Sequence, residues 1–250
     1  MAEKTAIEWT DATWNPTSGC TKVSPGCAHC YAETLTLRFH RGGPFLPGKS
    51  AIHMHYSRLN LPLTWHTPKK IFVNSMSDLF HEDIPLRFIK RVFSTMVEAK
   101  HHTFQILTKR AERLAKVYDK LPWAKNIWMG VSVENQYWAN KRIPLLLEVP
   151  ASVRFLSCEP LLRPLNLERY LPDLQWVIVG GESGPHARPV DLIWIRNLRD
   201  QCQLASVPFF LKQLGGHPNK RGHEKALLDG QLFRQMPCLY EHDNKKVSIG

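Results

Sequence analysis

The sequence predicts an α/β protein whose parallel strands form a full or partial (β/α) barrel. Short, nearly continuous apolar runs alternate with longer segments that have the period of an amphipathic helix. This alternation is typical of buried parallel strands that are covered by helices on the outside. We expect about seven strands, as in a full or partial barrel. A doubly wound open sheet is the alternative.

Each element of the pattern occupies a definable range. The first strand is expected in the aromatic run 7–15, and later strands at 70–77, 102–108, 126–133, 152–157, 174–179 and 207–211. Helices are expected at 31–40, 86–100, 111–118, 137–147, 161–170 and 192–204, with the weakest pattern at 161–170. Residues 45–68 have no regular period. We expect one barrel domain over residues 1–214, and a basic, turn-rich extension over residues 215–250 that packs on it.

Composition and charge narrow the class of protein. With 43% hydrophobic residues in 250, the chain can bury a core and is not intrinsically disordered. The amino terminus has no apolar signal core, and no run reaches the roughly 18 apolar residues that a membrane span needs. We therefore expect no membrane association and a cytoplasmic location, where a reducing environment disfavours disulfides. The formal charge of +11 favours an anionic partner, nucleic acid or nucleotide, and a merely basic surface is the equal alternative.

Three cysteines, Cys20, Cys27 and Cys30, lie within eleven residues directly after the first expected strand. Thiolates at such short spacing suit a metal ion or an iron–sulfur cluster. A structural zinc site needs a fourth ligand, which Cys158 would have to supply from a strand end. A redox pair of Cys27 and Cys30 would leave Cys20 without a role. A cubane cluster bound by three thiolates would leave one iron open to a substrate or cofactor.

Polar residues follow most of the expected strands. In a parallel barrel, the side chains just past the carboxyl ends of the strands share one mouth, where the active site lies. Acids after three successive strands and lysines after two others are typical of a pocket that holds a ligand. We expect two groups there: catalytic Lys109, Glu134, Glu159 and Lys212, and cofactor-binding Asp78, Ser132, Gly180, Gly181 and Glu182. Lys109 and Lys212 are the expected anion holders, and His29 and His81 are expected to be hydrogen-bonding supports.

The cysteine cluster, followed by an aromatic residue in Cys30-Tyr31, resembles that of the radical S-adenosylmethionine superfamily. Six residues separate Cys20 from Cys27, whereas three are usual in that superfamily. A closer resemblance is to a phage-associated family of unassigned function, the gene-product thirty-seven/sixty-eight family. Some of its members occur beside a "three-Cys-motif partner" protein. The segments that carry this resemblance are 7–16, 19–32, 107–110, 130–134, 156–160, 180–183 and 210–213.

The resemblance implies an enzyme in which Cys20, Cys27 and Cys30 hold a [4Fe–4S] cluster. Its fourth iron would chelate the amino and carboxylate groups of S-adenosylmethionine. An electron donor would then trigger cleavage of the sulfonium and formation of a 5′-deoxyadenosyl radical, which abstracts hydrogen from a substrate. The basic charge and the phage association favour a nucleobase, nucleotide or nucleic acid as that substrate. The alternative is a non-catalytic nucleic-acid-binding protein that is stabilised by zinc or a cluster.

Overall fold

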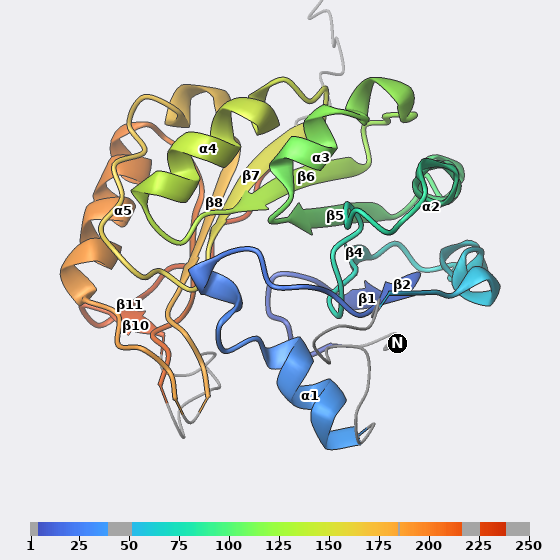
Figure 1. The fold of residues 1–250 in the computed structure, drawn as a ribbon. Coiled ribbons are helices and arrows are strands. Elements are labelled where there is room, and N and C mark those ends of the chain that lie inside the picture. Colours follow the sequence, from blue (N-terminus) through green and yellow to red (C-terminus); the bar gives the residue numbers. More distant parts are fainter. Residues whose placement is uncertain (1–4, 40–51, 185, 217–225, 239–250) are drawn as a thin grey trace, which may run out of the picture.

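The computed structural model describes residues 5–39, 52–184, 186–216 and 226–238, and its centre is a parallel sheet (Figure 1). The seven strands of this sheet are β1 (Ala12–Trp14), β4 (Lys70–Val73), β5 (Thr103–Thr108), β6 (Ile127–Ser132), β7 (Val153–Cys158), β8 (Trp176–Gly180) and β9 (Phe209–Gln213). They follow one another in the sheet in the order of the chain. A doubly wound sheet requires a reversal of strand order, so the barrel-like prediction is confirmed.

Helices cover the outer face of the sheet. They are α2 (Leu86–Glu98), α3 (Ala111–Ala115), α4 (Gln136–Leu147) and α5 (Leu192–Leu204). Figure 1 shows these four helices around the outside of the curved sheet, with α1 (Tyr31–Phe39) well apart from them. Alternate strand residues, such as Ile71 and Val73, face the helices and belong to the larger of two buried clusters. This alternation is the period of two that a strand imposes on its side chains.

The other face of the sheet curls around Trp9. Five strands contribute an aromatic residue to a second buried cluster, namely Phe72, Trp128, Phe155, Trp176 and Phe210. The ring of Trp9 lies 4.7 Å from that of Phe72 on β4 and 6.1 Å from that of Trp176 on β8. In a flat sheet, β4 and β8 would be four strand spacings apart, which is roughly 19 Å. The sheet is therefore a half-barrel, and among the described residues β1 and β9 form its two edges.

Short elements complete the described chain. The two-stranded pairs are β2 (Thr17–Ser18) with β3 (His53–Met54), and β10 (Leu227–Leu228) with β11 (Gln231–Leu232). The 3₁₀ turns are η1 (Pro25–Cys27), η2 (Tyr56–Arg58), η3 (Leu61–Thr64), η4 (Tyr118–Lys120) and η5 (Leu171–Asp173). Thus β3, η2 and η3 lie in the region expected to be irregular, of which residues 45–51 fall outside the described residues.

The helix expected at 161–170 is wrong, because the segment is a loop. Its first backbone N–H groups bond to other elements instead of forming a helical turn. Leu161 N donates to Gly180 O at 2.9 Å, and Leu162 N donates to Glu134 O at 2.9 Å. Backbone donors that are satisfied by neighbouring strand ends no longer favour a helix.

The expected carboxy-terminal extension is described over residues 226–238, while 217–225 and 239–250 lie outside the described residues. Leu211 N of β9 donates to Phe233 O at 2.9 Å, and Trp176 Nε1 donates to Gln235 O at 2.9 Å. The described part of the extension therefore runs along the β9 edge. In the part of the chain that the structure describes, no helix is long and apolar enough to span a membrane.

Candidate active site

A cavity of about 370 Å³ lies at the carboxyl ends of the strands. Its volume is within the usual range of small-molecule sites, about 300–1,000 Å³. All three clustered cysteines line this cavity, together with most of the residues expected at the strand ends: Cys20, Cys27, Cys30, Asp78, Lys109, Ser132, Glu159, Gly181, Glu182 and Lys212. Glu134 and Gly180 are not among the residues that line it.

The inner face of the sheet continues into this cavity. Successive side chains of a strand alternate between the faces, so every second residue stays on the same side. Phe155 belongs to the inner cluster, and Ser157 and Glu159 follow it at that spacing and line the cavity. Phe210 and Lys212 repeat the relation on β9. The alternation thus delivers polar side chains from several strands to one place.

Asp78 is held by the protein itself. Its carboxylate accepts hydrogen bonds from Thr108 Oγ1 at 2.7 and 2.9 Å, from the backbone N of Lys109 at 2.9 Å and from that of Phe80 at 3.0 Å. The side chain is buried at 6% exposure. The three bonds from Thr108 and Lys109 tie the loop after β4 to the end of β5, which gives Asp78 a structural role in the wall of the cavity.

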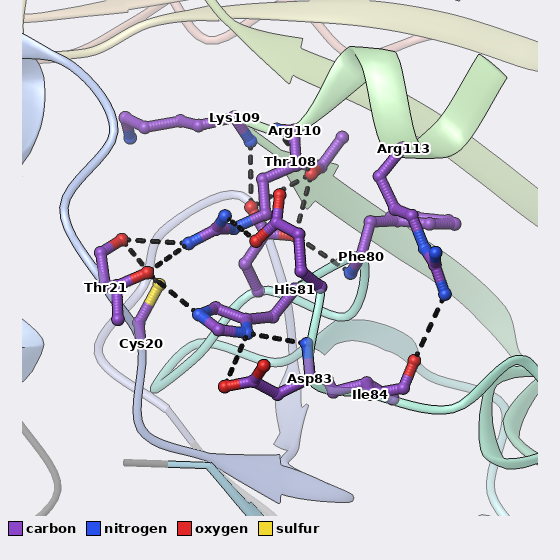
Figure 2. Close-up of polar contacts among 12 residues, drawn as sticks. Cys20, Thr21, Phe80, His81, Asp83, Ile84, Thr108, Lys109, Arg110 and Arg113 are labelled. Atoms are coloured by element: carbon purple, nitrogen blue, oxygen red, sulfur yellow. Dashed lines mark hydrogen bonds and ion pairs between the residues drawn. The ribbon is translucent and has the colours of Figure 1, made fainter. Parts of the chain in front are cut away.

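Two side chains hold the beginning of the cysteine loop, which we define as residues 20–30. Arg110 Nη2 donates to Thr21 O at 3.0 Å and to Thr21 Oγ1 at 2.7 Å. His81 Nε2 lies 2.8 Å from the same hydroxyl oxygen. Figure 2 shows Arg110 and His81 converging on Thr21 next to Cys20. His81 is thus a hydrogen-bonding support, as the sequence predicts.

Glu134 contacts the middle of the cysteine loop. Ser24 Oγ donates to Glu134 Oε1 at 2.5 Å, and Arg142 Nη1 donates to Glu134 Oε2 at 3.0 Å. The side chains of Glu134 and Arg142 are both 0% exposed. A Cβ added to Gly26 would lie 2.4 Å from Glu134 Cγ, so the loop rests directly on this carboxylate.

Glu182 holds the end of the cysteine loop. It accepts hydrogen bonds at 2.9 Å from Arg188 N and from Arg188 Nε, and His29 Nδ1 lies 2.9 Å from its Oε2. Arg188 Nη2 also donates to Pro25 O at 2.9 Å. Burial alone would raise the pKa of Glu182, but the hydrogen bonds from Arg188 and His29 outweigh it and lower that pKa to about 2. The carboxylate is therefore ionised and committed to the loop.

The two expected anion holders differ in their partners. Lys212 Nζ lies 2.9 Å from Glu159 Oε1, so its charge is neutralised. Glu159 Oε2 also accepts a long hydrogen bond from Ser157 Oγ at 3.4 Å. Lys109 Nζ donates to the neutral Ser132 Oγ at 3.3 Å and forms no ion pair with an acid of the described chain. Lys109 is thus the cavity lysine whose charge is uncompensated.

Gly180 and Gly181, at the end of β8, lie where a larger side chain would clash with other parts of the protein. A Cβ at Gly180 would lie 2.6 Å from Glu159 Oε1. A Cβ at Gly181 would lie 2.4 Å from Leu214 O. Contacts within the protein therefore account for both glycines without a bound cofactor.

The cysteine thiols offer the right donor type for a metal, although they are not gathered around one point. None of the three is in a disulfide, and all line the cavity. Among the described residues, no three His, Cys, Asp or Glu side chains are arranged to hold a metal ion. Burial raises the pKa of the Cys20 thiol to about 12, with a further increase from Asp78 that Arg110 opposes. Binding a metal would require the sulfurs to converge and Cys20 to lose its proton.

Cys158, the fourth zinc ligand considered from the sequence, lies on the wrong face of β7. Its side chain is fully buried and belongs to the cluster beneath the outer helices. The cavity is reached from the opposite, inner face, where Phe155 and Ser157 lie. A site of four cysteines built from Cys158 and the cysteine loop is therefore not supported.

Sequence reasoning missed three arginines that position the cysteine loop, namely Arg110, Arg142 and Arg188. Arg142 had a detectable signal, because it shares the apolar face of α4 with Ile143 and Leu146, which are both fully buried. A charged residue on such a face indicates a buried partner. Arg110 and Arg188 follow strand ends without any comparable pattern.

Comparisons with known proteins give one family and one similar structure. Residues 4–237 match the family described as "Protein of unknown function (DUF5131)". No curated protein matches the chain. A solved structure of a spore photoproduct lyase double mutant, with bound AdoMet and dinucleoside spore photoproduct, is similar at 13% identity and a TM-score of 0.45. The match covers 76% of this chain and 60% of that one, so this chain spans less than two thirds of the lyase chain.

Proposed function

This chain belongs to the DUF5131 family, and we propose that it is a radical S-adenosylmethionine-type iron–sulfur enzyme. In this proposal, Cys20, Cys27 and Cys30 hold a [4Fe–4S] cluster at the mouth of the half-barrel. The observation that carries the proposal is that all three thiols line one cavity together with strand-end polar residues. Three sulfur donors suit an iron–sulfur cluster with one open iron.

The cofactors would supply the chemistry that the side chains cannot. When bound at Cys20, Cys27 and Cys30, the cluster would supply the electron for reductive cleavage of S-adenosylmethionine, and so the radical chemistry that removes a hydrogen atom from the substrate. The cluster would need an electron donor, and a reducing cytoplasm would keep the cysteines available.

The chain's own residues would position the reactants and exclude water. Lys109 and the Glu159–Lys212 pair face the cavity and can orient charged groups of a ligand. The inner cluster around Trp9 closes the base of the half-barrel beneath the cavity. Glu134 and Glu182 would act on the cysteine loop and not on the substrate.

The resemblance to the phage-associated gene-product family extends the proposal to partners. A nucleobase, nucleotide or nucleic acid is the proposed substrate class, in keeping with the net charge of +11. A three-Cys-motif partner protein is the proposed protein partner. Co-purification of that protein with the whole chain would test this part of the proposal.

Release of 5′-deoxyadenosine tests the proposed function. The protein is purified and reconstituted without oxygen, reduced with dithionite in the presence of S-adenosylmethionine, and assayed by liquid chromatography. We expect 5′-deoxyadenosine from the wild type and from the control Cys158→Ala, and none from Cys27→Ala. A colourless protein that holds one zinc ion and releases none would favour the non-catalytic nucleic-acid-binding alternative.

A further inference from the structure

We propose that Lys109 is the phosphate-binding residue of the cavity, and that the ligand is a free nucleoside monophosphate whose base lies on the apolar floor beside Trp9. This inference rests on the proposed function and names the substrate class of the same cavity.

Among the described residues, the other acids and the other lysine that line the cavity are paired with an opposite charge or held by several hydrogen bonds, whereas Lys109 has one neutral partner. Lys212 is paired with Glu159 at 2.9 Å. Asp78 accepts four hydrogen bonds from the protein, and Glu182 is bound by Arg188. The ammonium of Lys109 donates to the hydroxyl of Ser132 at 3.3 Å and, among the described residues, forms no ion pair.

An uncompensated lysine in a cavity favours an anionic ligand. Lys109 is half-buried, so part of its hydration is already lost, whereas its three N–H donors have one neutral acceptor. Figure 2 shows its side chain extending away from Thr108 and Arg110, which are engaged with other groups. A phosphate would supply both the charge and the acceptor oxygens that this ammonium lacks.

The hydroxyls next to Lys109 would complete the phosphate subsite. Ser132 at the end of β6 and Ser157 on β7 are register partners, and both line the cavity. Both residues are nearly fully buried, at 1% exposure. The Ser132 hydroxyl accepts from Lys109 and keeps its own O–H for a phosphate oxygen. The Ser157 hydroxyl now donates to Glu159 at 3.4 Å and would donate to the phosphate after turning from that long bond.

The apolar floor of the cavity suits the flat ring of a base. It lies about as far from Lys109 as the base of a nucleotide lies from its phosphate. The apolar residues that line this floor are Ile7, Trp9, Phe72 and Leu107. The rings of Trp9 and Phe72 lie 4.7 Å apart. Leu107 lies on β5 and Lys109 directly follows that strand, so extended backbone would separate the two residues by roughly 6.6 Å. One sugar unit separates the phosphate from the base of a nucleotide, and a cavity of about 370 Å³ is sized for one such unit, not for a duplex.

Calorimetric titration tests the phosphate subsite. The probes are the four common ribonucleoside 5′-monophosphates, the matching nucleosides, and S-adenosylmethionine, each titrated into the whole protein at low salt. We expect at least one monophosphate to bind at least tenfold more tightly than its nucleoside. Lys109→Ala should reduce that ratio to below threefold without weakening S-adenosylmethionine binding, whereas Lys109→Arg should retain it. Lys141→Ala, which removes an exposed lysine of α4, is the matched control and should keep the ratio.

The outcomes separate this inference from the proposed function. Equal binding of monophosphate and nucleoside, no binding of any monophosphate, or an unchanged ratio in Lys109→Ala would overturn the inference. A loss of S-adenosylmethionine binding in Lys109→Ala would also overturn it, since Lys109 would then hold that cofactor. Iron content and 5′-deoxyadenosine release are measured on the same preparations, so a phosphate preference without iron would uphold the inference and refute the enzyme.

Discussion

Two fully buried charges, Glu134 and Arg142, lie beneath the cysteine loop and not in the cavity. A buried ion pair loses hydration on both sides and gives little net stability, so its retention calls for another role. Here the carboxylate also accepts a hydrogen bond from Ser24 at 2.5 Å. The pair therefore links α4 to the loop that carries the cysteines, across 110 positions of sequence.

Replacing Arg142 should lower the free energy of unfolding far more than replacing its neighbour Lys141. Arg142→Ala leaves the Glu134 charge buried without its partner, and we expect a loss of about 3–5 kcal/mol in the free energy of unfolding. Lys141→Ala changes an exposed residue on the same helix, whose ammonium lies 4.9 Å from the ring of Tyr137, and should alter it by less than about 1 kcal/mol. Chemical denaturation of the two variants gives both values. Similar losses would mean that Glu134 does not depend on Arg142.

Glu182 should make the fold sensitive to acid. Its pKa in the folded protein is about 2, below the ordinary 4.5, so ionisation stabilises the folded state above pH 4.5. That contribution, of the order of 3 kcal/mol, is lost as the pH falls from 4.5 to 2. The difference in unfolding free energy between wild type and Glu182→Gln should therefore shrink over this range. Glu168→Gln, an exposed control, should show no such trend, and a constant difference for Glu182→Gln would refute the argument.

At the scale of elements, the cysteine loop is held by side chains from the ends of other elements. Arg110 and His81 bind its beginning, Glu134 and Arg188 bind its middle, and Glu182 binds its end. A loop fixed at three places can present three thiols to the same cavity. These anchors would also limit how the sulfurs converge when a cluster binds.

A single methyl group should disturb this arrangement. In Gly26→Ala, the new Cβ would meet Glu134 Cγ and Oε1 at 2.4 Å, so the loop or the buried glutamate must move. We expect iron incorporation on reconstitution to fall at least fivefold while the far-ultraviolet circular dichroism is unchanged. Ala28→Ser, at an exposed position of the same loop, is the control and should load iron as the wild type does. Normal loading in Gly26→Ala would show that the loop does not depend on its contact with Glu134.

Strands, helices and strand-end residues can be predicted from the sequence where the local sequence pattern determines the structure. Positions just past the carboxyl ends of parallel strands share one mouth, which predicts that Lys109, Ser132, Glu159 and Lys212 lie together, and they do line one cavity. The segment 161–170 was mispredicted because its backbone donors are taken by distant strand ends. Glu134 and Glu182 were assigned to the ligand, since no local pattern reveals that their partners, 110 and 153 positions away, belong to the cysteine loop.

At the scale of the whole molecule, Trp9 closes the half-barrel. Its ring packs against strands that a flat sheet would hold far apart, and the cavity lies directly beside it. Trp9→Ala would leave a void on the inner face, and we expect about 3–5 kcal/mol of destabilisation. Trp138→Ala, at a partly buried position outside both core clusters, should cost clearly less in the same denaturation experiment. Equal costs would mean that the inner cluster does not hold the curled sheet.

Iron, sulfide and zinc analysis of protein purified without oxygen tests the central claim most directly. The claim is that the cysteine loop holds an iron–sulfur cluster at the mouth of the half-barrel. We predict about four irons and four sulfides per chain in the wild type and in Cys158→Ala, as a [4Fe–4S] cluster requires. Alanine at Cys20, Cys27 or Cys30 should abolish both. One tightly bound zinc with no iron, or full iron content without these cysteines, would contradict the account.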